Sequence, residues 1–300
     1  MVIASGCKLD LKLGYMVIRG EEIRKVHLSE ISTLIIENTS VSMTAMLLCE
    51  LTRKRIKVIL CDEVHNPYGE IAPYYGSHDT TAKIRAQITW RREVKNEVWK
   101  RLIQKKISNQ AEVVSSIDEN RADMLRRFAS EVESGDPTNR EGHAAKVYFN
   151  TLFGMDFSRR SDDPVNGLLN YGYAILLSAI NREISALGFI TQIGIFHDNV
   201  DNRFNLGYDL IEPLRPMVDS MVREMAPIMT TENKHGLARI LNKTVMIDGR
   251  VQYLNNAIPI YVKSVTDALC SEDPTSVRFC VDEVQSSEAD RLLRPACKDR

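Results

Sequence analysis

The chain of 300 residues has a formal net charge of −1, and 44% of its residues are hydrophobic and 26% charged. This composition is typical of soluble globular proteins, it excludes disordered and fibrous ones, and the length is enough for two domains with a buried core. The longest apolar run, residues 171–180, is too short to cross a bilayer, and no secretory signal is visible. We therefore expect a cytoplasmic protein that does not contact a membrane.

The six cysteines are scattered along the chain and form no CxxC pair. A chain of this length does not need disulfide bonds to stabilise a small core, and the spacing matches no zinc-binding pattern. We expect free thiols and no zinc site.

The small net charge hides an uneven distribution. Residues 83–106 contain nine Lys or Arg and two acids, whereas residues 271–290 contain six acids and one Arg. The total charge argues against a nucleic-acid partner, but a basic segment of this kind can follow DNA phosphates without contacting bases. The alternative is a solvated helix face with Trp90 and Trp99 in the core, and the pattern does not decide between the two.

The first part of the chain is rich in strand signals. Residues 15–19 and 23–28 flank Gly20-Glu-Glu22, which predicts a hairpin. Apolar residues at helical spacing predict a helix between Ser40 and Arg55, with Ser40 as its cap. Further short strands are predicted, in chain order, at residues 33–37, 57–61 and 70–72.

Helical patterns dominate the rest of the chain. They cover, in order, residues 80–130, 141–155, 165–188, 213–226 and 250–270. We predict an α+β fold in which a small β-rich N-terminal domain (residues 1–76) precedes a larger all-helical catalytic and DNA-binding domain (residues 77–300).

One candidate ligand lies near the start of a predicted helix. Asp136 before Pro137 is a good helix start, and Thr138-x-x-Glu141 fits a capping box, in which the Glu141 carboxylate caps its own helix. The alternative is that Glu141 binds a metal ion. From the pattern alone, capping is the more common outcome.

A second segment, residues 196–216, contains His197, Asp209 and Glu212 within sixteen residues. A neutral imidazole with carboxylates suits Mn²⁺ or Mg²⁺. The ordinary alternatives are that Asp209 is a helix N-cap, that Glu212 lies in a first turn and that His197 is a loop residue. Taken singly, each of these is favoured over metal binding.

The two segments together resemble the integrase of CRISPR spacer acquisition, the CRISPR-associated protein one family, and most of all its type II branch. The resemblance rests on Asn-Arg-Glu-Gly-His-Ala-Ala-x-x-Tyr-Phe-Asn at residues 139–150 and on Asp-x-x-Glu-Pro-x-Arg-Pro at residues 209–216, after a histidine. Shorter similar stretches occur at residues 27–31, 73–79 and 156–159. The similarity extends from about residue 14 to residue 219.

The resemblance implies that Glu141, His197 and Glu212 hold Mg²⁺ or Mn²⁺, and that Asp209 is a nearby catalytic acid that orients a ligand or water. In the family's reaction, the 3′-hydroxyl ends of a short DNA fragment attack phosphodiesters of the repeat array. A divalent ion can serve such a reaction as a Lewis acid and as a template for in-line geometry.

The resemblance also implies partners. It implies a homodimer formed through the N-terminal domain and bridged by a small CRISPR-associated protein into a heterohexamer. The DNA partners would be double-stranded DNA with 3′ overhangs and CRISPR repeat DNA, and the type II RNA-guided nuclease and its accessory DNA-binding ring would be further partners. The candidate phosphate contacts are Arg85, Arg91, Arg92, Arg140, Lys146, Arg159, Arg160, Arg182 and Arg203.

Two other functions remain open at this point. One is a general metal-dependent endonuclease for branched or single-stranded DNA, which the sequence cannot separate from an integrase because strand cleavage uses the same site. The other is a non-catalytic DNA-binding scaffold, against which the intact Glu141, His197 and Glu212 set weighs.

Overall fold

The β-rich part at the start of the chain contains two small sheets. The computed structural model describes residues 1–63, 67–71, 73 and 79–281. The first sheet has the strand order β4-β3-β2-β6 and consists of β2 (Lys8–Lys12), β3 (Tyr15–Arg19), β4 (Ile23–His27) and β6 (Ser42–Met43). The second has the order β1-β5-β7-β8 and consists of β1 (Val2–Ile3), β5 (Thr33–Ile36), β7 (Lys57–Cys61) and β8 (Pro67–Ile71). The predicted hairpin and strands are confirmed.

The parallel pairing of β5 with β7 requires a crossover, and α1 (Ala45–Arg53) supplies it. Both strands are almost entirely buried, as expected for parallel strands covered on both faces. The cap of α1 is Thr44, whose side chain accepts from the Leu47 amide at 3.3 Å. The prediction of Ser40 as the cap was wrong, because the Ser40 amide instead donates to the Asn38 side chain in a turn.

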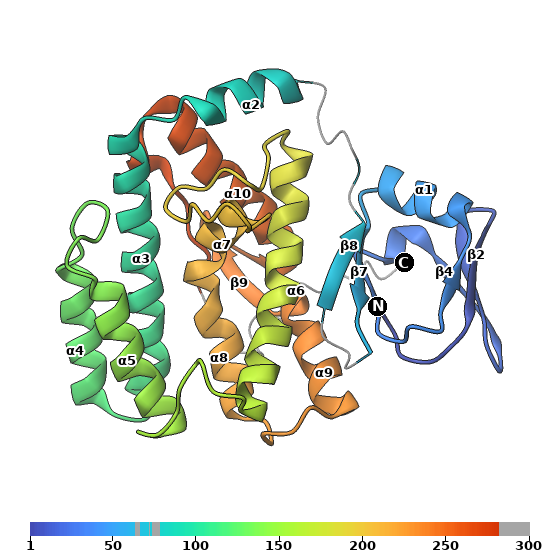
Figure 1. The fold of residues 1–300 in the computed structure, drawn as a ribbon, viewed down its shortest axis with the longest axis horizontal. Helices are drawn as coiled ribbons and strands as arrows, with labels where there is room; N and C mark the ends of the chain where they lie inside the picture. The colour runs from blue at the N-terminus through green and yellow to red at the C-terminus, as the bar shows by residue number, and fades with distance from the viewer. Residues whose placement is uncertain (64–66, 72, 74–78, 282–300) are drawn as a thin grey trace, which may run out of the picture.

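The larger part is mainly helical. In Figure 1, α6 runs through its centre, with α3, α4 and α5 on one side and the β-rich part on the other. The helices are α2 (Thr80–Ile88), α3 (Arg92–Ser115), α4 (Glu119–Ser130), α5 (Arg140–Phe153), α6 (Pro164–Ala186), α7 (Asn205–Ile211), α8 (Arg215–Arg223), α9 (Thr231–Ala238) and α10 (Leu254–Ser271). Short 3₁₀ turns are η1 (Leu28–Glu30), η2 (Glu212–Leu214), η3 (Arg239–Asn242) and η4 (Pro274–Ser276).

The helical part also contains a hairpin, so the prediction of an all-helical second domain was wrong in this detail. Strands β9 (Thr244–Ile247) and β10 (Arg250–Tyr253) pair antiparallel. Asp248 and Gly249 join them, with φ angles of +53° and +69°. An Asp-Gly pair favours such a turn because both positions need positive φ. The helix predicted from residue 250 therefore begins at Leu254.

The two parts share buried contacts. Helix α6 packs against β7 and β8, and Ile35, Ile59 and Cys61 belong to the same hydrophobic core as the helices. Lys234 Nζ in α9 lies 3.2 Å from Glu37 Oε1 after β5, and both side chains are buried. The predicted boundary at residue 76 lies outside the described residues.

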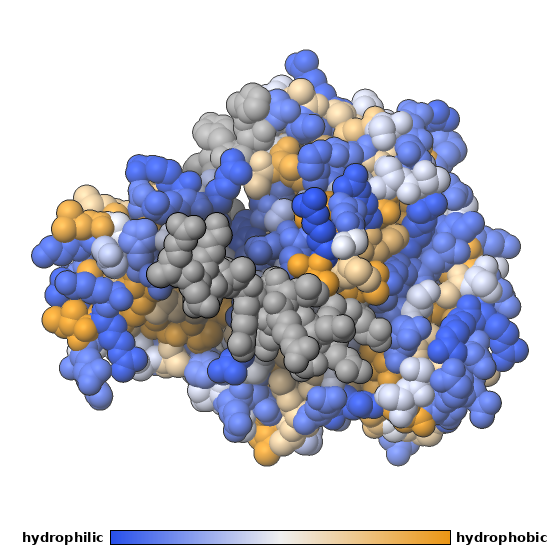
Figure 2. All heavy atoms as spheres, turned by 180° about the vertical axis from the view of Figure 1, so that it is seen from behind, coloured by the Kyte–Doolittle hydropathy of each residue, from blue (hydrophilic) through white to orange (hydrophobic). Residues whose placement is uncertain are grey.

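The surface of the β-rich part carries exposed apolar side chains. Leu13, Tyr15, Ile23 and Met46 are all substantially exposed, and Ile23 in β4 is 65% exposed. Figure 2 shows orange atoms at the surface of this part, at the left of the view. All five cysteines of the described part have free thiols, as predicted. Within the described ranges, no helix is long and apolar enough to span a bilayer.

Candidate active site

Asp209 organises the loop that carries His197. Its side chain is fully buried in α7, and its carboxylate accepts from the amides of Ile195, Phe196 and His197 at 2.5, 3.1 and 3.0 Å. The same carboxylate lies 2.7 Å from His197 Nδ1. Asp209 therefore lies inside its helix, so the N-cap alternative for this residue is wrong.

The contact with Asp209 sets the state of the His197 ring. An Nδ1–H that donates to a carboxylate leaves Nε2, on the far side of the ring, as the nitrogen that can bind a ligand. The hydrogen bond to Asp209 is also the main reason why the pKa of His197 is raised, although partial burial opposes it. The His197 side chain stays part-exposed, so a ligand can reach it.

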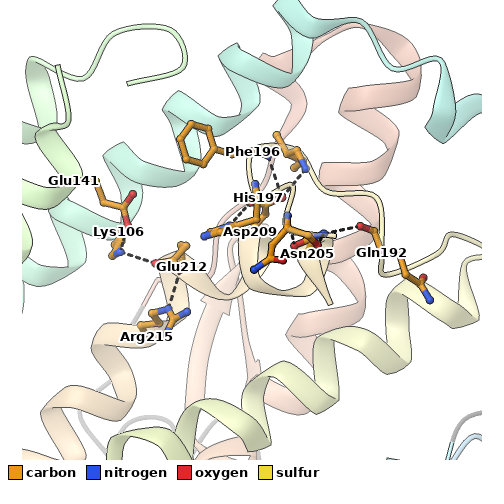
Figure 3. A network of polar contacts seen from close by, with 11 residues as sticks. Lys106, Glu141, Gln192, Phe196, His197, Asn205, Asp209, Glu212 and Arg215 are labelled. Atoms are coloured by element: carbon orange, nitrogen blue, oxygen red, sulfur yellow. Dashed lines mark hydrogen bonds and ion pairs between the residues drawn. The ribbon is translucent and has the colours of Figure 1, made fainter. Parts of the chain in front are cut away.

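Close packing keeps this loop in place. A Cβ atom on Gly194 would lie 2.4 Å from the His197 carbonyl oxygen and 2.7 Å from Asp209 Oδ2, so only glycine fits there. The Asn205 side-chain amide donates to the carbonyls of Gln192 and Asn199, each at 2.9 Å. Figure 3 shows this network around His197. The imidazole is therefore held before any ligand arrives.

Glu141 does not cap its own helix, so the capping-box prediction was wrong. The cap of α5 is Asn139, in the left-handed region with φ of +52°, and its side chain accepts from the Gly142 amide. The Asp136 carboxylate accepts from the amides of Arg140 and Glu141 at 2.8 and 3.0 Å. With these donors satisfied, the Glu141 side chain is available to a neighbouring helix.

That neighbour is Lys106 in α3. Lys106 Nζ lies 2.5 Å from Glu141 Oε1 and 2.5 Å from Glu212 Oε2, and only 8% of the residue is exposed. Burial alone would lower the pKa of Lys106, but Glu212 and Glu141 outweigh it and raise the pKa. A buried ammonium ion therefore joins two carboxylates that come from distant parts of the sequence (Figure 3).

Glu212 is ionised in this arrangement. It lies in η2, and its second oxygen, Oε1, accepts from Arg215 Nε at 2.9 Å. Burial would raise the pKa of Glu212, but Arg215 and Lys106 lower it to about 2. The same two cations offset the cost of burying the carboxylate.

The donor set fits a hard divalent cation, although it is not closed around one. Two carboxylates converge on a single positive charge, and an imidazole with a fixed Nδ1 lies nearby, which suits Mg²⁺ or Mn²⁺. Among the residues that the structure describes, no three His, Cys, Asp or Glu side chains form a ready cluster. The Lys106 ammonium lies between the carboxylates at the place where such an ion could bind.

The candidate phosphate contacts fall into two groups. Arg140 contacts Glu131 at 3.1 Å, Arg159 binds Asn166 and Asn170, and Arg182 binds Glu183 at 2.7 Å, so protein groups hold all three. Trp90 and Trp99 are buried in the core. The side chains that remain exposed to solvent are Arg85, Arg91, Arg92, Lys146, Arg160 and Arg203.

Sequence reasoning missed two residues of this site. Lys106 was counted with the basic segment, and Arg215 was noted only as part of a motif. Lys106 follows Trp99, Leu102 and Ile103 on the buried side of α3, and that helical spacing could have shown that it points inward.

A model of the family described as CRISPR associated protein Cas1 matches residues 1–235. The CRISPR-associated endonuclease Cas1 of Neisseria meningitidis serogroup C is 38% identical over 224 residues, which cover 74% of each chain. A CRISPR-associated endonuclease Cas1 of Francisella tularensis subsp. novicida is 26% identical over 238 residues, 71% of this chain and 74% of that protein. The chain belongs to the Cas1 family, as its motifs predicted.

Solved structures share the fold. A casposase bound to an integration product superposes with a TM-score of 0.74 at 20% identity and covers 95% of both chains. A CAS1 protein from Thermotoga maritima superposes with a TM-score of 0.73 at 17% identity, over 89% of this chain and 96% of that one. The β-rich part followed by a mainly helical part is therefore an architecture that the fold neighbours also have.

Proposed function

We propose that this protein is a metal-dependent DNA integrase of CRISPR adaptation. It joins the 3′-hydroxyl ends of short DNA fragments to the repeat array by phosphodiester transesterification. The observation that carries the proposal is the convergence of Glu141 and Glu212 on one cation, beside an imidazole that Asp209 anchors. Relatives named endonucleases and a fold neighbour bound to an integration product support DNA strand chemistry.

In this proposal Glu141, Glu212 and His197 Nε2 hold Mg²⁺ or Mn²⁺, which supplies Lewis acidity to the phosphodiester when bound. Arg215 holds the Glu212 carboxylate in place, and Asp209 fixes the direction of the His197 ring. Attack by a 3′-hydroxyl forms one phosphodiester and breaks another, with a 3′-oxygen as leaving group. The number of phosphodiester bonds is unchanged, so the reaction needs no energy source and no covalent protein intermediate.

We further propose that the protein acts as a homodimer that contacts DNA with 3′ overhangs and repeat DNA. The exposed apolar side chains of the β-rich part support it as the dimer surface, and exposed Arg85, Arg91, Arg92, Lys146, Arg160 and Arg203 are available to phosphates. Fold neighbours described as a Cas6-RT-Cas1--Cas2 complex and a TtCas1-DNA complex support a small bridging protein and DNA as partners. The motifs favour a type II setting, with its RNA-guided nuclease and accessory ring, in the cytoplasm.

A joining assay tests the function. Supercoiled plasmid DNA with a repeat is mixed with a short DNA fragment and Mn²⁺ or Mg²⁺, and joined and cleaved products are separated. The wild type is expected to join the fragment, and Glu141→Gln, His197→Ala and Glu212→Gln are each expected to lose roughly 100-fold or more in rate. Glu224→Gln, an exposed acid in the same region, is the matched control.

The outcomes separate the alternatives. A wild type that only cleaves, with water in place of the 3′-hydroxyl, is a general endonuclease. Binding of DNA with neither joining nor cleavage indicates a scaffold. Full joining by Glu141→Gln contradicts the assignment of the site.

A further inference from the structure

Phe196 presents an aromatic ring to solvent beside the candidate active site. The residue is 50% exposed and directly precedes His197 in the chain. Its ring lies parallel to that of Trp99, with 4.4 Å between centroids and 1° between planes. Exposed single apolar residues are common, but this one is stacked and adjacent to a candidate ligand.

The position of the Phe196 ring is fixed from two directions. The Phe196 amide donates to Asp209 at 3.1 Å, so the carboxylate that anchors His197 also anchors this residue. Trp99 is 1% exposed and belongs to the core of α3, so the indole beneath the ring is immobile. A planar ligand would therefore bind a surface that needs no reordering, which favours affinity.

The exposed ring is also close to the groups that would do the chemistry. The His197 ring centroid is 6.0 Å from that of Phe196 and 5.7 Å from that of Trp99, with both planes nearly perpendicular to the imidazole. Figure 3 shows Phe196 next to His197, above the helix that carries Lys106. A flat group on Phe196 would have its attached atoms within reach of His197.

Nucleobases are the flat groups that DNA offers, and an aromatic side chain stacks on any base because each has a π face. Within a duplex both faces of a base are covered by its neighbours, so the exposed ring suits an unpaired base. Stacking of this kind holds the strand without reading its sequence.

We propose that Phe196, backed by Trp99, is the stacking surface for one unpaired base of the 3′ overhang, and so places the 3′-hydroxyl at the site. This inference rests on the proposed function and names the part of the substrate that binds there. The competing role for Phe196 is purely structural, as a cover for Trp99.

A binding experiment on the full chain separates the two roles. Affinity is measured by fluorescence anisotropy, in the presence of EDTA so that no strand is cut or joined. The probe is a labelled duplex with a single-stranded 3′ overhang, used intact or with one abasic residue at each overhang position in turn. The wild type is expected to lose about tenfold in affinity at one position of the abasic residue.

Phe196→Leu keeps an apolar cover over Trp99 but has no aromatic face. It is expected to bind the intact overhang about tenfold more weakly and to lose nothing further on the abasic overhang. Phe196→Tyr keeps the ring and is expected to bind as the wild type does. Val200→Ala, 96% exposed in the same loop, is the matched control and should leave the affinity unchanged.

Three results would overturn the inference. If Phe196→Leu binds the intact overhang as tightly as the wild type, Phe196 only covers Trp99. If the losses from Phe196→Leu and from the abasic residue add, the ring and the base do not meet. If the wild type does not bind the overhang at all, the proposed function fails, and this inference fails with it.

Discussion

Lys106 sets the charge balance around the two candidate ligand carboxylates. Its ammonium lies 2.5 Å from an oxygen of each, in a region almost closed to water. Two buried carboxylates repel each other unless a cation lies between them. A divalent ion that binds the same oxygens must displace the ammonium ion or overcome its repulsion.

Replacement of Lys106 by methionine is therefore expected to have opposite effects on the metal-free and the metal-bound protein. Lys106→Met should lower the melting temperature without metal, because Glu141 and Glu212 lose a shared cation. It should also tighten Mn²⁺ binding by about tenfold, roughly 1.4 kcal/mol, because a competing charge is gone. Mn²⁺ titration followed by electron paramagnetic resonance, with thermal unfolding alongside, measures both; Lys100→Met is the control, and weaker Mn²⁺ binding would refute the argument.

Asp219 in α8 gives a pH-dependent term in stability. It is buried and accepts a hydrogen bond from the Tyr173 hydroxyl, and burial raises its pKa to about 6. The folded state therefore holds this proton over a pH range in which the unfolded chain has lost it, so the free energy of unfolding falls as pH rises towards 6 and above.

Asp219→Asn removes this titration while it keeps an oxygen that can accept from Tyr173. Between pH 5 and pH 7 the free energy of unfolding of the wild type should fall by about 1 kcal/mol relative to the variant. Urea unfolding of both proteins at each pH measures the difference. A difference that is constant with pH would show that Asp219 titrates as an ordinary carboxyl.

The candidate ligands themselves were predictable from the sequence, but their partners were not. Glu141, His197 and Glu212 stand in long motifs, whereas the roles of Lys106 and Asp209 depend on which elements pack together. A count of charges along α3 cannot tell the buried Lys106 from exposed neighbours such as Arg91 and Arg92.

At the scale of elements, a break between two helices places Glu212. Pro213 and Pro216 lack the amide that a continuous helix needs, and the chain forms the 3₁₀ turn η2 between α7 and α8. The helix predicted from residue 213 therefore begins at Arg215. The turn directs the Glu212 carboxylate at both Lys106 and Arg215.

The loop around Asp209 depends on Gly194 in a similar way. Gly194→Ala would place a Cβ atom 2.7 Å from Asp209 Oδ2, so the loop must shift and the His197 ring with it. We expect a loss of about 10- to 100-fold in Mn²⁺ affinity, as is usual when a group that orients a ligand is disturbed. Isothermal titration with Mn²⁺ measures this, and Gly69→Ala, with open space around it, is the control. Equal Mn²⁺ affinity of Gly194→Ala and the wild type would count against the role of Asp209.

Element boundaries differed from the prediction where local contacts outweigh periodicity. Asn139 with positive φ and Asp136 together satisfy the first amides of α5, a pattern that a capping-box search does not find. The hairpin at Asp248-Gly249 interrupts a segment whose apolar residues also fit a helix.

At the scale of the whole molecule, hydrophobic patterning predicted the β-rich and helical parts, but not how they join. That join depends on α6 against β7 and β8 and on the buried contact between Lys234 and Glu37, which link segments far apart in sequence. The exposed apolar side chains of the β-rich part are left outside this join.

These side chains lead to a prediction about assembly. Ile23→Glu on the outer strand β4 should convert the proposed dimer to a monomer, because it puts a charge into an apolar contact. Light scattering after gel filtration should give twice 34.0 kDa for the wild type and 34.0 kDa for the variant. The melting temperature of an Ile23→Glu monomer would show that its own fold is intact; a variant that stays dimeric would place the interface elsewhere.

The most direct test of the whole account is a crystal structure of the protein soaked in Mn²⁺, with the ion located by its anomalous scattering. The account predicts a peak within roughly 2.0–2.3 Å of oxygens of Glu141 and Glu212 and of His197 Nε2, with Lys106 Nζ moved away from the carboxylates. A peak elsewhere, or Lys106 still between the two carboxylates in saturating Mn²⁺, would contradict it.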